Sequence, residues 1–201
     1  MTATRVYLFR HGEVERAETR RFIGHLDVPL SARGEAQCTT QSARLHSVPL
    51  VAMYSSDLAR ARRSAELLGA PRGLVPVAVP ALREMSMGRW EGLTNEEIRA
   101  REPEAFEAWM AGIGQFAFPE GESVPDLIAR AWPAFEQLTA AHDGAAFAVV
   151  AHGGTNRAIV CRALGLPLDR ILALGQGYAA LTVLVRAGDR WAVSRLNEEP
   201  W

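Results

Sequence analysis

The chain has 201 residues, of which 48% are hydrophobic and 22% charged, and its formal net charge is −1. This balance is typical of a globular protein with a sizeable core, and we expect one domain over residues 1–201. A charge so close to zero provides no overall attraction to nucleic acid or to an anionic membrane surface, so we expect neither as a partner. No apolar run is long enough for a transmembrane helix, and the N-terminus lacks the apolar core of a signal peptide.

The chain has two cysteines and no lysine. Cys38 and Cys161 are far apart and belong to no Cys-X-X-Cys pair, which excludes a disulfide framework or zinc knuckle and favours a cytoplasmic location. All 22 basic residues are arginine. This excludes lysine Schiff-base catalysis, a pyridoxal-phosphate linkage and the P-loop lysine. Any anion is therefore bound by arginine, histidine or backbone N–H groups.

Strands and helices are predicted to alternate along the chain. In order, we expect a strand at 5–9, a helix at 31–46, a strand at 48–54, a helix at 57–68, a strand at 74–79, a helix at 123–142, a strand at 145–151, a helix to about 164, and strands at 178–185 and 191–196. Ser55, Ser56 and Asp57 are suited to cap the helix at 57–68, and Pro133 is expected to kink the helix at 123–142. The helix at 31–46 is expected to be capped by Ser31.

The segment between the third strand and the next long helix has a different composition. Residues 80–122 are rich in Glu, Trp, Met and Gly, with glycine and proline breaks near 112–114 and 118–121. We expect helical pieces and loops that form a cap, inserted at about 85–122. The alternation elsewhere predicts an α/β fold, a three-layer α/β/α sandwich with a mainly parallel sheet.

Polar residues follow three of the predicted strands. Arg10 and His11 come directly after the first strand, a serine-rich turn follows the second, and His152 and Gly153 follow the strand at 145–151. Ligands of open α/β sheets bind beyond the carboxyl ends of the strands, so these groups are expected to converge. This convergence is the central inference from the pattern.

The converging residues suit phosphoryl transfer. A histidine fixed at the end of a buried strand is well aimed to attack phosphorus, and a neighbouring arginine presents a donor fork that matches phosphate oxygens. His152 adds a second imidazole, and Gly153 allows the backbone N–H to approach an anion closely. A single His-Gly pair after a strand is more often structural, but two such pairs favour function. Acidic residues are not clustered at ligand spacing, so we expect no metal and no cofactor.

On these residues the chain resembles the histidine phosphatase superfamily, in its phosphoglycerate-mutase-like branch. The sequence Arg-His-Gly-Glu at 10–13 looks like the family signature, and 55–61 matches its S-x-L-x-R-A pattern. Further similarity lies at 23–34, 82–92, 119–123 and 151–154. The resemblance covers about residues 5–196, in order, and implies a phosphoglycerate mutase-like fold.

The resemblance implies roles for individual residues. His11 would be the nucleophile that forms a phosphohistidine, and Glu84 would protonate the leaving group and then deprotonate the attacking water. His152, with Arg10, Arg60 and the N–H of Gly153, would hold the phosphoryl oxygens. Losing one such donor typically costs about 3 kcal/mol of barrier.

The chain departs from the family pattern after residue 13. Many members carry an asparagine a few residues further on, whereas in this chain either Ala17 stands at the matching position or the loop has been rebuilt. The phosphate contact that this asparagine makes in the family could be made here by Arg16, Arg20 or Arg21, or could be missing. As candidate substrate contacts we take Arg16, Arg21, Ile23 and Gly24. Solvated loop charge is the alternative for the arginines.

The resulting functional hypothesis is a phosphomonoesterase for a small phosphorylated metabolite. The compact length and the segments at 23–34, 55–65 and 119–123 look most like α-ribazole phosphatases of cobalamin assembly. Sugar phosphates, phosphoglycerates, phosphoserine and nucleotides are alternative substrates. Phosphoglycerate mutase-type transfer and an inactive phosphate-binding protein are alternative functions, and a homodimer is the assembly considered.

Overall fold

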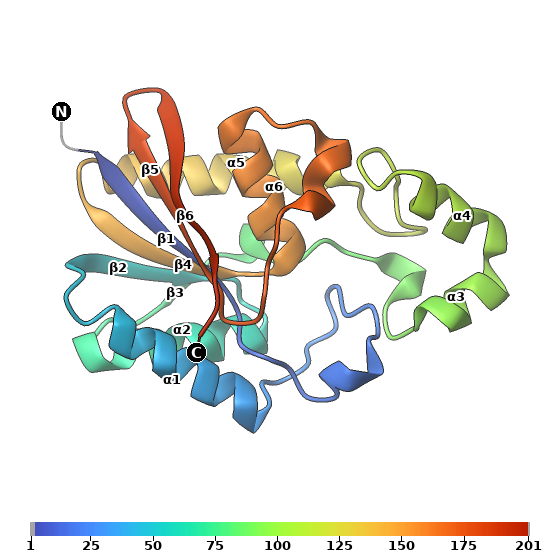
Figure 1. Cartoon of the computed structure of the whole chain (residues 1–201), viewed down its shortest axis with the longest axis horizontal. Helices are drawn as coiled ribbons and strands as arrows, with labels where there is room; N and C mark the ends of the chain where they lie inside the picture. Colours follow the sequence, from blue (N-terminus) through green and yellow to red (C-terminus); the bar gives the residue numbers. More distant parts are fainter. Residues whose placement is uncertain (1–2, 201) are drawn as a thin grey trace.

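The computed structural model describes residues 3–200, so residues 1, 2 and 201 of the predicted domain lie outside it. Six strands form one sheet in the order β3-β2-β4-β1-β5-β6 (Figure 1). They are β1 (Thr4–Arg10), β2 (Leu50–Ser55), β3 (Val77–Ala78), β4 (Ala146–Ala151), β5 (Leu181–Ala187) and β6 (Arg190–Glu198). The first four strands are parallel, whereas β5 runs antiparallel to β1 and β6 antiparallel to β5.

Helices cover both faces of the sheet. The α-helices are α1 (Ala32–Arg44), α2 (Ala59–Gly69), α3 (Asn95–Arg101), α4 (Pro103–Ala111), α5 (Val124–Ala141) and α6 (Gly153–Leu164). Short 3₁₀ helices are η1 (Ala17–Thr19), η2 (Ala70–Arg72), η3 (Pro80–Leu82), η4 (Gly88–Trp90) and η5 (Leu168–Ala173). In Figure 1, α5 and α6 lie above the sheet and α1 and α2 below it. The predicted three-layer α/β/α sandwich with a mainly parallel sheet is confirmed.

The alternation of side chains along β4 explains the two covered faces. Phe147 and Val149 pack with residues of α5 and α6, whereas Ala148 and Val150 pack with residues of α2. Successive side chains of a strand point to opposite faces, so a strand that is apolar throughout is buried on both sides. The central strands therefore hold their carboxyl ends rigidly.

Two of the predicted strands were wrong in extent. The strand expected at 74–79 pairs only over β3, because Pro76 has no N–H to give to a sheet and the N–H of Leu74 donates to Gly69. The strand expected at 178–185 begins at Leu181, because Ala179 has a φ of 53° and its N–H donates to the carbonyl of His11. The other predicted bounds agree with the structure to within two residues.

The predicted cap of α2 is also corrected. Leu58 stands at the N-cap position and makes no side-chain bond to the helix, although Ser56 Oγ accepts from its N–H. The N–H of Ala59 instead donates to Asp27, a residue from a distant loop. Ser31 caps α1 as expected, through a bond from the N–H of Gly34. The helix α5 is continuous through Pro133.

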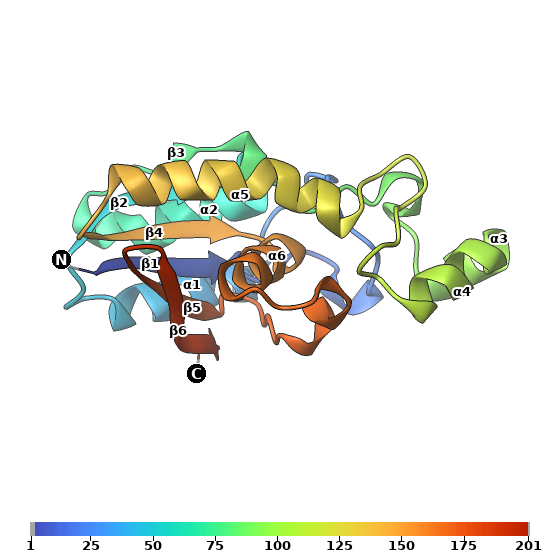
Figure 2. The ribbon, with the colours of Figure 1, turned by 90° about the horizontal axis from the view of Figure 1, so that it is seen from above.

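The segment predicted as a cap forms η4, α3 and α4, which lie beyond the carboxyl ends of the parallel strands in both views (Figures 1 and 2). Its core is an aromatic cluster around Trp90, which is fully buried. Rings of Phe22, Trp109, Phe116 and Phe118 lie 5.3–6.0 Å from the Trp90 ring, centroid to centroid. These aromatic residues therefore pack together at the base of the cap. Within residues 3–200, no helix is long and apolar enough to cross a membrane.

Candidate active site

The two predicted histidines are brought together by neighbouring strands. β1 and β4 pair in parallel with Arg10 opposite Ala151, so His11 and His152 leave adjacent strands at the same level. Their ring centroids lie 5.2 Å apart, and both side chains are buried. The convergence expected at the strand ends is therefore present.

The hydrogen bonds of His11 select one of its ring nitrogens. Nδ1 lies 2.7 Å from the carbonyl oxygen of Gly12. Since a carbonyl only accepts, Nδ1 carries the proton and Nε2 keeps its lone pair. The backbone of His11 is held on both sides, because its N–H donates to Ala151 and its carbonyl accepts from Ala179. The imidazole thus has a fixed position and one free basic nitrogen.

Both imidazoles are held in the neutral form. Burial lowers the pKa of His11 well below its usual value, and the charges of Arg10 and Arg60 lower it further. Burial likewise lowers the pKa of His152, with Arg60 as the next cause. A neutral imidazole is the form that can attack phosphorus.

Two arginines border the histidines with unused donors. Arg60 is fully buried and donates through Nη1 to Leu26 and through Nη2 to Gly24, each at 2.7 Å. Arg10 donates to the carbonyl of Gln176 and lies 4.0 Å over the ring of Tyr178. Within residues 3–200, no acceptor is bonded to Nε of either arginine or to either ring nitrogen of His152. Buried polar atoms are rarely left without a partner, so this cluster is suited to an anion.

Glu84 lies at the N-terminus of α6. Its Oε2 accepts from the N–H of Gly154 at 2.9 Å, and its Oε1 accepts from Thr155 at 3.1 Å and from Met85 at 2.9 Å. The free N–H groups at this end of the helix hold the carboxyl oxygens of Glu84 in place. A side chain on Gly154 would begin 2.5 Å from Glu84 Oε1, so this close contact requires glycine. Glu84 is thereby placed on the same helix end as Gly153.

A cavity of about 350 Å³ connects these residues. Its walls include eight of the ten predicted site residues: Arg10, His11, Arg21, Ile23, Gly24, Arg60, Glu84 and Gly153. His152 adjoins His11 but is not part of the wall. Arg16 instead borders a neighbouring cavity of about 540 Å³, together with Ala17.

The loop after residue 13 contributes two arginines to the cavity wall. Arg20 and Arg21 both border the cavity, but Arg21 is paired with Glu97 at 2.7 Å. No ion pair of Arg20 is found within residues 3–200. Arg16 and Arg20 both have positive φ, at 57° and 48°, which is uncommon for residues other than glycine. The prediction that Arg16 contacts substrate receives no support from its position, since it lies outside the wall around His11.

Among the wall residues that the sequence reasoning missed are Arg157 and Tyr178. Arg157 donates through Nε to the carbonyl oxygen of Leu174. A Cβ atom placed on Gly153 would lie 3.3 Å from Nη1 of Arg157 and 3.6 Å from Nε of Arg10, so both guanidinium groups approach the same point. Burial lowers the pKa of Arg157, and Arg10 adds to the effect. Its spacing of one helical turn from Gly153 was a usable signal. Tyr178, whose ring lies 5.8 Å from that of His11, comes from a loop and left no such signal.

Comparison with known families gives a match over almost the whole chain. The model of the histidine phosphatase superfamily (branch 1) matches residues 6–199. The chain therefore belongs to the histidine phosphatase superfamily, branch 1. Several of the similar proteins are phosphatases by name. A probable phosphoglycerate mutase of Serratia proteamaculans (strain 568) is 32% identical over 81% of this chain and 75% of its own length. Phosphoserine phosphatase 1 of Hydrogenobacter thermophilus is 28% identical over 96% of this chain and 92% of its own length.

Solved structures show the same fold. A mycobacterial glucosyl-3-phosphoglycerate phosphatase has a TM-score of 0.86 and 33% identity, over 97% of this chain and 99% of its own. A putative alpha-ribazole-5'-P phosphatase from Escherichia coli K-12 has a TM-score of 0.89 and 25% identity, over 97% of this chain and 96% of its own. These similar proteins act on different phosphate esters by name, so family membership leaves the substrate open.

Proposed function

We propose that this chain hydrolyses the phosphate monoester of a small metabolite through a phosphohistidine on His11. In this mechanism Nε2 of His11 attacks phosphorus, and the bond from phosphorus to the ester oxygen breaks. Glu84 gives its proton to that oxygen as it leaves. In the second step Glu84 takes a proton from water, the water oxygen attacks phosphorus, and the bond to Nε2 breaks. Phosphate is released and both residues return to their starting forms.

The surrounding donors are assigned to the phosphoryl oxygens. Arg10, Arg60 and His152 would bind the oxygens that carry charge in the transition state, together with the N–H of Gly153. Arg157 is added to this set because its guanidinium approaches the same point beside Gly153. The observation that supports the proposal most is the group of buried donors without protein acceptors around a histidine with a free Nε2. A phosphoryl group would satisfy these donors together.

For the substrate we propose α-ribazole 5′-phosphate as the first compound to examine, which would place the chain in cobalamin assembly. The similar structure from Escherichia coli supports this choice. Phe22, Trp109 and Tyr178 in the cavity wall offer rings against which a base could lie. Phosphoserine and phosphoglycerates are competing substrates, supported by other relatives. A cytoplasmic location and a homodimer remain predictions.

The test is phosphate release from a panel of phosphomonoesters, including α-ribazole 5′-phosphate, with a chelator present throughout. We expect turnover that the chelator leaves intact and that His11→Ala abolishes. Mass spectrometry of peptides kept at neutral pH should find the phosphoryl group on His11 after rapid mixing. His46→Ala, at an exposed histidine after α1, serves as the control and should retain activity. No release from any ester, or equal release by His11→Ala, would contradict the proposed mechanism.

Mutase activity is the second candidate, because the Serratia relative is a probable phosphoglycerate mutase. It predicts an isomerised phosphoglycerate as product and dependence on a bisphosphate primer. Phosphate release without a primer, faster than isomerisation, would favour the phosphatase. Binding of phosphate without either reaction would favour an inactive phosphate-binding protein.

A further inference from the structure

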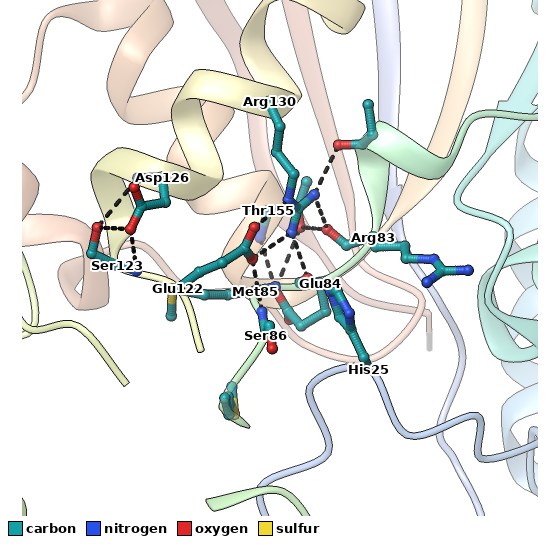
Figure 3. A network of polar contacts seen from close by, with 12 residues as sticks. His25, Arg83, Glu84, Met85, Ser86, Glu122, Ser123, Asp126, Arg130 and Thr155 are labelled. Atoms are coloured by element: carbon teal, nitrogen blue, oxygen red, sulfur yellow. Dashed lines mark hydrogen bonds and ion pairs between the residues drawn. The ribbon is translucent and has the colours of Figure 1, made fainter. Parts of the chain in front are cut away.

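Arg130 of α5 lies outside the cavity wall but is bonded to the segment that carries Glu84 (Figure 3). Its Nη1 donates to the carbonyl oxygens of Ala81 and Arg83, both at 2.9 Å. Its Nη2 donates to the carbonyl oxygen of Glu84 at 2.6 Å. The same guanidinium donates to both carboxylate oxygens of Glu122, at 2.6 and 2.8 Å. All five N–H groups of Arg130 are therefore used, three of them on one short stretch of backbone.

The stretch held by Arg130 has little regular structure of its own. It begins in η3, which ends at Leu82, and the next 3₁₀ helix begins only at Gly88. Without a ladder or helix, a backbone segment is fixed by the contacts that reach its carbonyl and N–H groups. The location of the Glu84 carboxylate consequently depends on bonds to residues 81–86 from outside the segment.

Glu122 completes the attachment from the other end of the cap segment. Its Oε2 accepts from the N–H of Ser86 at 2.8 Å, two residues beyond Glu84. Burial alone raises the pKa of the Glu122 carboxyl, but hydrogen bonds from Arg130 and Ser86 outweigh this, and the net pKa lies below its usual value. The pair is mostly shielded from solvent, with Arg130 25% and Glu122 21% exposed. Arg130 thus has its counter-ion beside it.

Two further side chains contact the same segment, each by fewer bonds. His25 Nε2 lies 2.7 Å from the carbonyl oxygen of Glu84 and donates to it, since a carbonyl only accepts. Thr155 Oγ1 donates to the carbonyl of Arg83 at 2.8 Å. Arg130 is the side chain that joins three carbonyls of the segment at once. Its planar fork makes this geometry, which the single ammonium of a lysine cannot reproduce.

We infer that Arg130 is a positioning residue for proton transfer: it fixes the backbone of residues 81–84 so that Glu84 faces the leaving oxygen. This inference rests on the proposed function, in which Glu84 is the general acid. A displacement of about 1 Å in a catalytic group can cost 100-fold in rate. The cost falls on proton transfer rather than on phosphate binding, because Arg130 contacts neither His11 nor the arginines around it.

The experiment compares two substrates that differ in their need for an acid. An alkyl phosphate, chosen as the best alkyl ester of the panel, must have its leaving oxygen protonated, whereas p-nitrophenolate leaves readily without a proton. kcat/KM reports the steps up to departure of the leaving group. For Arg130→Met we expect kcat/KM to fall about 100-fold on the alkyl ester and less than about tenfold on p-nitrophenyl phosphate. Arg130→Lys should recover part of the loss on the alkyl ester.

Three companion variants make the result decisive. Glu84→Gln should show the same selective loss, and Glu122→Gln a smaller loss in the same direction, which covers the case in which Arg130→Met does not fold. Arg89→Met is the matched control, because Arg89 pairs with Glu102 and Glu120 in the cap and bonds to no carbonyl of residues 81–86 through its side chain. Inhibition by vanadate should be unchanged in the Arg130 and Glu122 variants.

The outcomes separate the inference from the function beneath it. Suppose that Glu84→Gln shows the selective loss on the alkyl ester. If Arg130→Met and Glu122→Gln then lose activity equally on both esters, or lose none, the positioning role of Arg130 is overturned. If Glu84→Gln showed no selective loss, Glu84 would not be the general acid. The proposed mechanism and the positioning role of Arg130 would then both be contradicted. Selective loss in Arg130→Met, Glu122→Gln and Glu84→Gln, with Arg89→Met at the wild-type rate, would support both the positioning role and the proposed function.

Discussion

The neutrality of His11 and His152 has a cost in stability that depends on pH. Both imidazoles have pKa values well below the usual range because they are buried beside arginines. In the unfolded chain each histidine returns to a pKa of about 6.5. Between the two values the unfolded state binds more protons than the folded state, so stability falls as the pH is lowered. Above about pH 6.5 this destabilising contribution disappears.

The first prediction concerns this acid-side slope. Without phosphate, we expect the free energy of unfolding to decrease below about pH 6.5 by up to about 1.4 kcal/mol per pH unit for each buried histidine. His11→Gln should make the slope of unfolding free energy against pH shallower, by at most the contribution of one bound proton. Urea unfolding at a series of pH values measures it. His46→Gln, at an exposed position, should keep the wild-type slope. Superimposable slopes for wild type and His11→Gln would mean that His11 is charged in the folded protein.

At the scale of residues, the sequence located the side chains whose place follows from a strand end. His11, Arg10 and His152 qualify because a parallel pair brings the carboxyl ends of its strands to one edge. Glu84 was reached only by resemblance, since it lies in a segment without periodicity. Arg130 was not predicted at all. On α5 it resembles an ordinary solvated arginine, and only the folded chain brings it against residues 81–84.

Among the elements, the cap segment shares a hydrophobic core with α5 and α6, and this core also borders the cavity. Trp90 lies in the middle of this core, whereas Phe22, Trp109 and Phe118 reach from it to the wall around His11. Aromatic rings contribute large buried areas, so a cap of this size can be ordered by a few of them. The shape of this side of the cavity consequently depends on the packing around Trp90.

The second prediction tests that packing. Trp90→Ala should lower the free energy of unfolding by about 3–5 kcal/mol, as other large-to-small changes in cores do. It should also raise KM, because rings of the wall lose their support. Urea unfolding and steady-state kinetics measure the two effects. Met110→Ala, 59% exposed on α4, is the control and should change stability by less than about 0.5 kcal/mol. A similar loss for both variants would argue against a packed cap core.

The order of elements was predictable because the hydrophobic periods switch cleanly between strand and helix. The errors lie where a backbone contact from a distant part of the chain decides the outcome. Ala179 turns away from the expected strand to bond to His11, and Asp27 rather than a local side chain caps α2. Such contacts have no trace in local propensity, because they exist only when the sheet has formed.

For the whole molecule, the third prediction is that phosphate stabilises the folded state. A ligand at 100 times its dissociation constant adds about 2.7 kcal/mol, and each kcal/mol raises the Tm of a domain of this size by about 2–4 °C. We expect a rise in Tm with inorganic phosphate, and little with chloride at equal ionic strength. Arg157→Gln should need more phosphate for the same rise. If phosphate left the Tm of the wild type unchanged, anion binding at this site would be refuted.

The pairing of β1 has a consequence for how the chain is made. Arg5 lies opposite Ala146 in β4, and the other neighbour of β1 is β5, which begins at Leu181. A ribosome adding about 5–20 residues per second therefore releases the strand that precedes His11 many seconds before either partner strand exists. Through that interval Val6, Leu8 and Phe9 have no sheet to enter. The nascent chain thus leaves this apolar segment without its sheet for many seconds, which favours chaperone binding to β1 during synthesis.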